Sequence, residues 1–83
     1  MARTPIVTDI KLLRTKQRLN QHQFWSRLGV TQSGGSRYES GRNAPAPTQT
    51  LIDLVYGPKK RALELLAELR GITLEELVGK ASK

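Results

Sequence analysis

Several features are missing from this chain, and each absence removes a class of protein. Among its 83 residues there is no cysteine and a single histidine, His22, which excludes a disulfide framework, a thiolate metal site and a histidine metal cluster. No combination of histidine, cysteine and carboxylate groups is available for catalysis, so we expect no enzyme, no cofactor and no metal. No apolar run approaches the roughly 20 residues of a membrane span, and the N-terminus lacks the apolar core of a signal peptide. We therefore expect a soluble, cytoplasmic protein with no membrane partner.

Acidic residues are scarce in the first half of the chain. Residues 1–43 carry eight lysines and arginines against two acids, a net charge of +6, whereas residues 44–83 carry six bases against five acids, a net charge of +1. A basic half joined to a nearly neutral half favours a polyanion-binding face and a separate packing or pairing face. On charge alone, a basic surface that only aids solubility stays open as the alternative.

Apolar residues recur at helical spacing along most of the chain. This pattern predicts an all-α fold of five to six helices in one domain, residues 9–79. We expect residues 1–8 to form a flexible N-terminal arm and residues 80–83 a flexible tail. The positions expected to face the core are Ile10, Leu12, Leu13, Phe24, Trp25, Leu28, Leu51, Ile52, Leu54, Val55, Ala62, Leu65, Leu66, Leu69, Leu74, Leu77 and Val78.

Capping residues predict where the helices begin and end. The expected caps and first-turn residues are Thr8 or Asp9, Asn20, Thr31, Thr48, Pro58 and Thr73. Gln23 and Glu76 lie three residues after two of these caps and complete capping boxes. Glycines at 29, 41 and 71 are expected to end helices, because glycine accepts a positive φ. Two prolines in residues 44–47 predict an exposed loop.

Residues 20–43 carry most of the functional information. They predict two short helices joined by a tight turn, and one side of the second helix is polar rather than apolar. The residues of that side are Gln32, Ser33, Ser36 and Arg37. These side chains need hydrogen-bond partners, and the edges of DNA bases offer suitable donors and acceptors.

The run LNQHQFWSRLGVTQSGGSRYESGRNAPAP resembles the helix-turn-helix of the phage Cro and CI repressor family, also called the XRE family. Gln21 opens the first helix of the motif, residues 28–30 form the turn, residues 31–33 begin the recognition helix and residues 37–42 close it. The resemblance covers about residues 9–70 and implies a lambda-repressor-like fold.

The resemblance implies that the second helix of the motif lies in the major groove of double-stranded DNA. Gln32 and Ser33 would then reach the groove floor, with Ser36 and Arg37 one turn later on the same side. Glutamine pairs with adenine and arginine with guanine, so Arg37 is the best candidate for a guanine reader. Its alternative role is a phosphate clamp, since phosphate and sugar accept at least half of protein–DNA hydrogen bonds.

Four further positions match DNA backbone contacts of the family. They are Asn20, Gln21, Arg42 and Asn43. Asn20 also fits a simple capping role, and the two roles are compatible. Arg14 and Glu39 match a pair that forms an ion pair between the first and third helices in some family members, which would make Arg14 structural.

Two positions depart from the family pattern. The site of Trp25 is usually a small residue, and the site of Gly35 is usually a β-branched apolar residue. We expect that the indole of Trp25 fills the space vacated at Gly35, which would conserve core volume. The alternative is a partly exposed Trp25 on the surface or at an interface.

Two functions remain open from the sequence. The first is a transcriptional repressor that binds a pseudo-palindromic operator as a homodimer through its C-terminal helices, where Ile72, Leu74, Leu77 and Val78 exceed the needs of a small core. The second is a protein-interaction module such as an antitoxin, whose main partner is a small toxin and whose DNA binding is autoregulatory.

Overall fold

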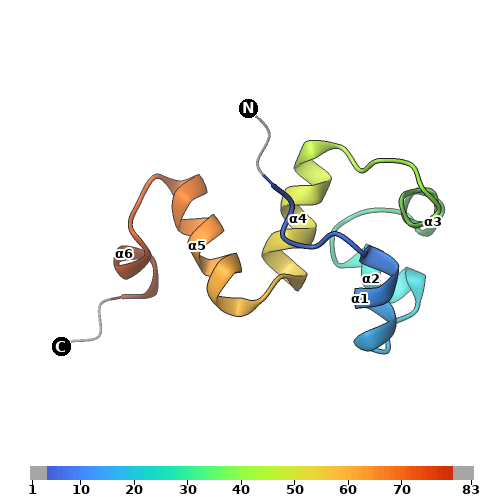
Figure 1. Ribbon diagram of the computed structural model, residues 1–83, viewed down its shortest axis with the longest axis horizontal. Helices are drawn as coiled ribbons and strands as arrows, with labels where there is room; N and C mark the ends of the chain where they lie inside the picture. The colour runs from blue at the N-terminus through green and yellow to red at the C-terminus, as the bar shows by residue number, and fades with distance from the viewer. Residues whose placement is uncertain (1–3, 80–83) are drawn as a thin grey trace.

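The computed structural model describes residues 4–79, and this range is all-α, as predicted (Figure 1). The six helices are α1 (Ile10–Lys16), α2 (Gln21–Ser26), α3 (Gln32–Glu39), α4 (Ala46–Tyr56), α5 (Lys59–Arg70) and α6 (Leu74–Val78). The first three residues and the expected tail at residues 80–83 lie outside the described range.

Local capping explains most of the helix boundaries. Gln23 N donates to Asn20 Oδ1 at 2.7 Å and Asn20 N donates to Gln23 Oε1 at 2.9 Å, which is the predicted capping box. Thr73 and Glu76 form the second capping box in the same way. Thr31 accepts from the amide of Gly34 at 3.1 Å and begins α3. These caps confirm the predicted starts of α2, α3 and α6.

Two predicted helix starts are wrong. Thr48 does not cap α4, which begins two residues earlier at Ala46 with Pro45 as its N-cap residue. Pro47 fits the first turn because an amide there has no carbonyl partner within the helix, so a proline loses nothing. Pro58 is the N-cap residue of α5 rather than a member of its first turn.

The core lies between α2 and α4. Phe24, Trp25 and Ile52 have no exposed surface, and Leu28 and Tyr56 are also buried among them. The rings of Phe24 and Tyr56 stack with centroids 4.0 Å apart, and the Tyr56 hydroxyl donates to the carbonyl of Phe24 at 2.7 Å. This bond satisfies the one polar group of a buried aromatic pair and fixes α2 against α4.

The N-terminal segment is part of this core. Val7 is buried, its amide donates to Asp53 Oδ1 at 3.0 Å, and its carbonyl accepts from Gln49 Nε2 at 3.0 Å. The expectation of a flexible arm reaching residue 8 is therefore wrong around Val7, because two side chains of α4 bind its backbone. Asp53 has no exposed surface, and its Oδ2 is buried without a hydrogen-bond partner among residues 4–79.

Helices α5 and α6 extend away from the rest of the domain. α5 packs on α4, and α6 packs on α5 (Figure 1). The molecule is elongated, with dimensions of 45 × 30 × 19 Å. Its radius of gyration is 14.1 Å. A compact chain of this length would have about 12 Å. The C-terminal helices therefore form an arm rather than another layer over the core.

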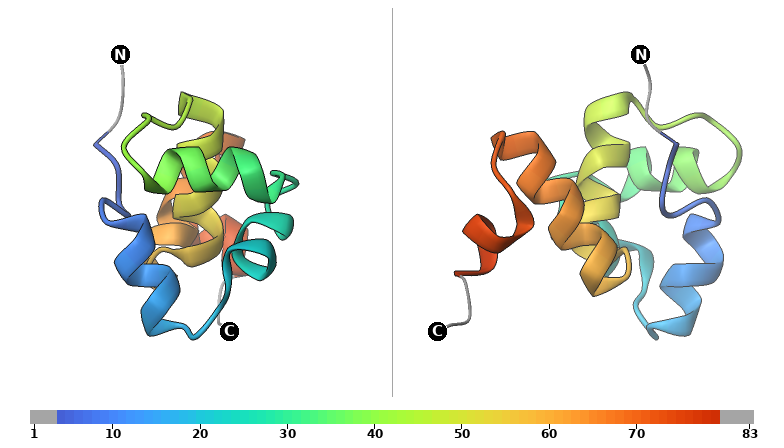
Figure 2. Two further views of the ribbon diagram at one scale, coloured as in Figure 1. Left: turned by 90° about the vertical axis from the view of Figure 1, so that its right-hand side faces the viewer. Right: turned by 60° about the vertical axis from the view of Figure 1, so that its left-hand side comes forward.

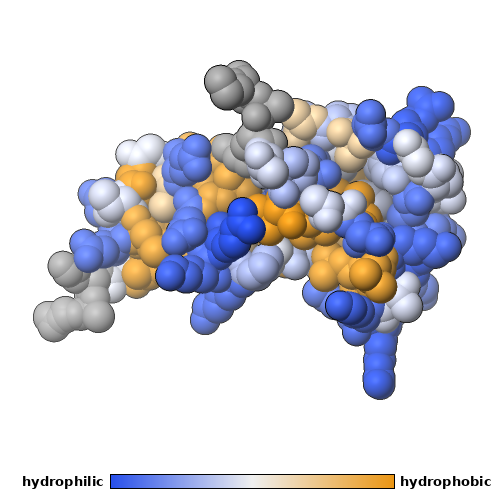
Figure 3. All heavy atoms as spheres, viewed as in Figure 1, coloured by the Kyte–Doolittle hydropathy of each residue, from blue (hydrophilic) through white to orange (hydrophobic). Residues whose placement is uncertain are grey.

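Several apolar residues expected to face the core are exposed instead. They are Leu12, Leu51, Val55, Leu69 and Val78. Helical spacing predicted which residues share a face, but α1, α4, α5 and α6 carry more apolar positions than their neighbours cover. Figure 3 shows apolar side chains gathered over the α5–α6 end of the molecule.

The connection from α1 to α2 contains an unusual backbone conformation. Arg18 has φ 59°, and it is the one residue other than glycine with a positive φ within residues 4–79. A left-handed conformation costs a residue with a side chain about 1–2 kcal/mol. The amide of Arg18 donates to Thr15 O at 3.0 Å and closes the last turn of α1.

Candidate nucleic-acid interface

A tight turn sets α3 across the end of α2. Gly29 has φ 74°, as expected for the residue that ends α2, and the amides of Leu28 and Val30 both donate to the carbonyl of Trp25, at 3.0 and 3.1 Å. The left-hand view of Figure 2 shows α3 on the outside of the molecule, in front of the other helices. One long side of α3 is thus available to a partner.

The outward side of α3 is polar and has few internal contacts. Gln32, Ser33 and Arg37 are exposed, and Ser36 is half-buried. Ser33 Oγ lies 3.4 Å from the hydroxyl of Thr31, whereas the other three side chains form no hydrogen bond or ion pair with any described residue. Gln32 with Ser36, and Ser33 with Arg37, are spaced four residues apart and form two adjacent columns on this surface.

Gly34 does not belong to the outward side. A Cβ atom added to Gly34 would lie 3.2 Å from Thr31 Oγ1 and 3.4 Å from Val30 Cγ1, both in the turn before α3. A side chain at this position would therefore point toward the protein's own turn.

The indole of Trp25 fills the space beside Gly35, as the large residue at 25 and the small one at 35 predicted. Trp25 has no exposed surface, so an exposed surface aromatic is excluded, and a Cβ atom at Gly35 would overlap the Cγ and Cδ1 atoms of the indole. Tyr38 also packs against this indole, with ring centroids 5.6 Å apart. The backbone of α3 rests directly on the indole, and only glycine at position 35 permits this approach.

Glu39 joins three helices through four hydrogen bonds. Arg14 donates through Nε to Oε2 at 2.9 Å and through Nη2 to Oε1 at 3.0 Å, which is the ion pair expected between the first and third helices. Trp25 Nε1 donates to Oε2 at 2.8 Å, and Gln21 Nε2 donates to Oε1 at 3.3 Å. Each carboxylate oxygen thus accepts two bonds, which fills its capacity.

This environment shifts the titration of Glu39. Its side chain is 3% exposed, and burial on its own would raise the pKa of the carboxyl. The hydrogen bonds from Arg14, Trp25 and Gln21 and the charge of Arg14 outweigh burial, so the pKa lies below its ordinary value of 4.5. Glu39 is therefore ionised at neutral pH, and Arg14 is committed to it rather than to an external anion.

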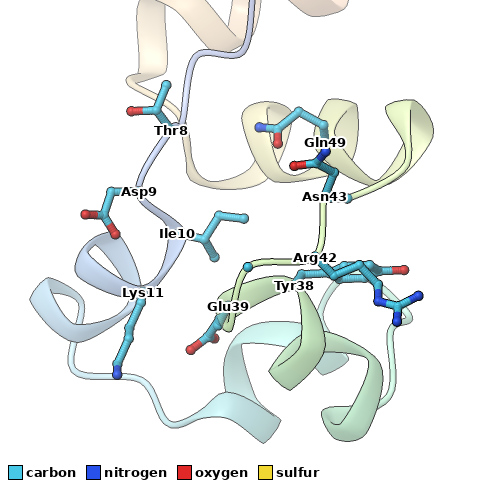
Figure 4. A pocket seen from close by; sticks show the side chains of 11 residues that line it. Thr8, Asp9, Ile10, Lys11, Tyr38, Glu39, Arg42, Asn43 and Gln49 are labelled. Carbon is cyan, nitrogen blue, oxygen red and sulfur yellow. The ribbon is translucent and has the colours of Figure 1, made fainter.

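The four residues matched to DNA backbone contacts lie in different environments. Asn20 is exposed, but its side-chain oxygen caps α2, and Gln21 is half-buried with its amide nitrogen bound to Glu39. Arg42 and Asn43 are exposed beyond the end of α3. They border an open depression of 340 Å³ whose other side is lined by residues 8–11, and Figure 4 shows the guanidinium of Arg42 directed away from Asp9 and Lys11.

Within residues 4–79, no three side chains of metal-ligating type come together, and no helix is long and apolar enough to cross a membrane. A family model described as the RsaL-like helix-turn-helix domain matches residues 11–55, which run from α1 to the end of α4 and make up more than half of the chain. The match confirms a helix-turn-helix DNA-binding domain. Comparisons with curated proteins and with solved structures give no match.

Gly35→Ala should lower the free energy of unfolding by about 1–3 kcal/mol, because the added methyl overpacks the contact with Trp25. The matched control is Gly34→Ala, where the new methyl would lie 3.2 Å from Thr31 Oγ1, a contact that a shift of a few tenths of an ångström relieves. The gain in helix propensity there is up to about 1 kcal/mol. Urea unfolding followed by tryptophan fluorescence measures both variants. Equal stability of Gly35→Ala and the parent chain would contradict the described contact.

A double variant tests whether Trp25 and Gly35 share one space. Trp25→Ala combined with Gly35→Val reverses the exchange of large and small. The double variant should be less destabilised than the sum of its two single variants, because each substitution relieves the defect of the other. Simple additivity would show that the two positions do not share one space.

Glu39→Gln should lower the free energy of unfolding at neutral pH by about 3–5 kcal/mol, because it leaves the Arg14 charge buried without its partner. In the parent chain, the stabilisation that comes from the lowered pKa of Glu39 should be lost as the pH falls below about 4.5 and through the lower folded pKa, since the unfolded state then binds the proton first. Urea unfolding over a series of pH values checks both effects. The variant should show a correspondingly smaller acid dependence, whereas Glu64→Gln, an exposed control, should keep the parent profile.

Proposed function

Because the chain belongs to the family of RsaL-like helix-turn-helix domains, we propose that it is a sequence-specific regulator of transcription that inserts α3 into the major groove of double-stranded DNA. The observation that carries this proposal is the outward side of α3. The side chains of Gln32, Ser36 and Arg37 have no hydrogen-bond or ion-pair partner among the described residues, and Ser33 contacts only the hydroxyl of Thr31. The helix itself is held by a buried ion pair and a closely packed indole.

The chemistry of that side fits base edges. Gln32 offers an amide that pairs with adenine N6 and N7, and Arg37 offers a guanidinium that pairs with guanine O6 and N7. Ser33 and Ser36 are short and either donate or accept, which suits them to contacts near the groove floor. Each bidentate pair contributes about 1–3 kcal/mol of discrimination between bases.

Backbone contacts would come from both ends of the motif. Asn20 precedes α2, and Arg42 and Asn43 follow α3, so these exposed residues flank the proposed reading surface. Gln21 contributes less freely than its position in the motif implies, because one of its amide hydrogens is bound to Glu39. Contacts of this kind fix the register of the protein on DNA without reading sequence.

We further propose that two copies bind a pseudo-palindromic operator and pair through α5 and α6. Leu69 is 49% exposed and Val78 is 54% exposed, and both lie on the arm that extends away from the helix-turn-helix. Pairing there would cover this apolar surface and leave α3 of each copy free. The resemblance to the Cro and CI repressors supports repression, since a bound dimer would keep other proteins from the operator.

Selection of bound duplexes from a random pool tests the proposed function directly. The chain should enrich one consensus, and Arg37→Ala should relax that consensus at one guanine position in each half-site, because the bidentate contact is lost. An unchanged consensus with uniformly weaker binding would make Arg37 a phosphate clamp. No enrichment by the parent chain would overturn sequence-specific binding and favour the protein-interaction module.

The pairing surface is tested by placing charge on the arm. Leu69→Glu combined with Val78→Glu should convert the dimer to a monomer with an intact fold, because both side chains are about half exposed. Sedimentation equilibrium gives the mass, and circular dichroism gives the helix content. Leu12→Glu is the matched control, since Leu12 is 51% exposed on α1 and should leave the dimer unchanged. A monomeric parent chain would refute pairing through this arm.

A further inference from the structure

Arg18 adopts a left-handed backbone conformation that is costly for a residue with a side chain. The other described residues with a positive φ are glycines at 29, 41, 71 and 79, whereas Arg18 adopts φ 59° with a full side chain. The backbone role at this position, closing α1 with a hydrogen bond from the Arg18 amide to the carbonyl of Thr15, needs no particular side chain. Glycine would perform it with less strain.

The side chain of Arg18 also has no partner inside the protein. It is exposed and forms no hydrogen bond or ion pair with any described residue. The two acids of the basic half are both committed elsewhere, since Glu39 binds Arg14 and Asp9 caps the start of α1 by accepting from Leu12 N at 3.0 Å. A permanent positive charge is thus held on a strained turn without an internal anion.

The turn places this charge beside the proposed DNA contacts. Arg18 lies two residues before Asn20, and the left-hand view of Figure 2 shows the connection between α1 and α2 along the lower edge of the face that carries α3. The guanidinium of arginine binds phosphate through two parallel N–H donors, which matches a diester of the DNA backbone.

We propose that Arg18 is a DNA phosphate contact, held at the edge of the helix-turn-helix by its left-handed turn. This inference rests on the proposed DNA-binding function and adds a residue to it. Arg18 fixes register and adds affinity equally on all sequences, whereas Gln32 and Arg37 read bases.

The test is Arg18→Gly, measured on the duplex consensus that the parent chain selects. Glycine fits the left-handed turn, so the melting temperature should be unchanged or higher. DNA affinity should fall about tenfold or more, as expected for the loss of one hydrogen-bonded contact between charged groups. The slope of the logarithm of affinity against the logarithm of salt concentration should shrink by about 0.9, the value for one phosphate contact. The selected consensus should not change.

Two further variants separate a local contact from total charge. Arg18→Lys keeps the charge and should keep the salt slope, with an affinity between those of the parent and Arg18→Gly. Arg70→Gln removes one charge from the end of α5, far from α3 (Figure 1), and should leave the salt slope at the parent value. A folded Arg18→Gly variant with parental affinity and salt slope would overturn the contact while the DNA-binding function stands. A parent chain that binds no duplex would overturn both.

Discussion

The carboxylate of Glu39 is the constraint on which the helix-turn-helix depends. Helices of six and eight residues are too short to be stable alone, so α2 and α3 need contacts outside themselves to hold their crossing angle. Glu39 supplies them by accepting from Arg14 on α1 and from Gln21 and Trp25 on α2. The inner side of α3 is held by these bonds, so Gln32, Ser36 and Arg37 on its outer side are not needed to hold the helix in place.

The contact between Trp25 and Gly35 sets the position of the recognition helix α3. Two consecutive glycines weaken α3 by about 1.5–2 kcal/mol relative to alanine. The loss is offset because glycine at 35 admits an indole that is fully buried and donates to Glu39 at 2.8 Å. The position of the recognition helix therefore depends on an aromatic ring beneath it rather than on the strength of the helix itself.

Local chemistry was predictable from the sequence, whereas long-range contacts were predictable only where a pattern marked them. Asn20, Thr31 and Thr73 act within three residues, and their caps follow from residue type alone. The Trp25–Gly35 contact was predictable because the sequence has a large residue at 25 and a small one at 35, the reverse of the family pattern. The hydrogen bond from the amide of Val7 to Asp53 joins residues 46 positions apart. The only feature of the sequence that could have indicated it is an acidic residue among the apolar residues of α4. Helical spacing also gave the apolar faces of α4 and α5 without showing how much of each a neighbour covers.

The basic residues and the exposed apolar surface lie toward opposite ends of the molecule, which fits the proposed binding of DNA at one end and pairing at the other. The basic half folds into the helix-turn-helix, and the nearly neutral half forms α4, α5 and α6, which extend to the opposite end of a 45 Å long molecule. Pairing at that end would hold two α3 helices apart on one rigid body. Operator half-sites lie about 34–36 Å apart on one face of B-form DNA. The stacked rings of Phe24 and Tyr56, with centroids 4.0 Å apart, join α2 to α4, and α5 packs on α4. These two contacts therefore set the direction of the proposed pairing surface relative to the helix-turn-helix.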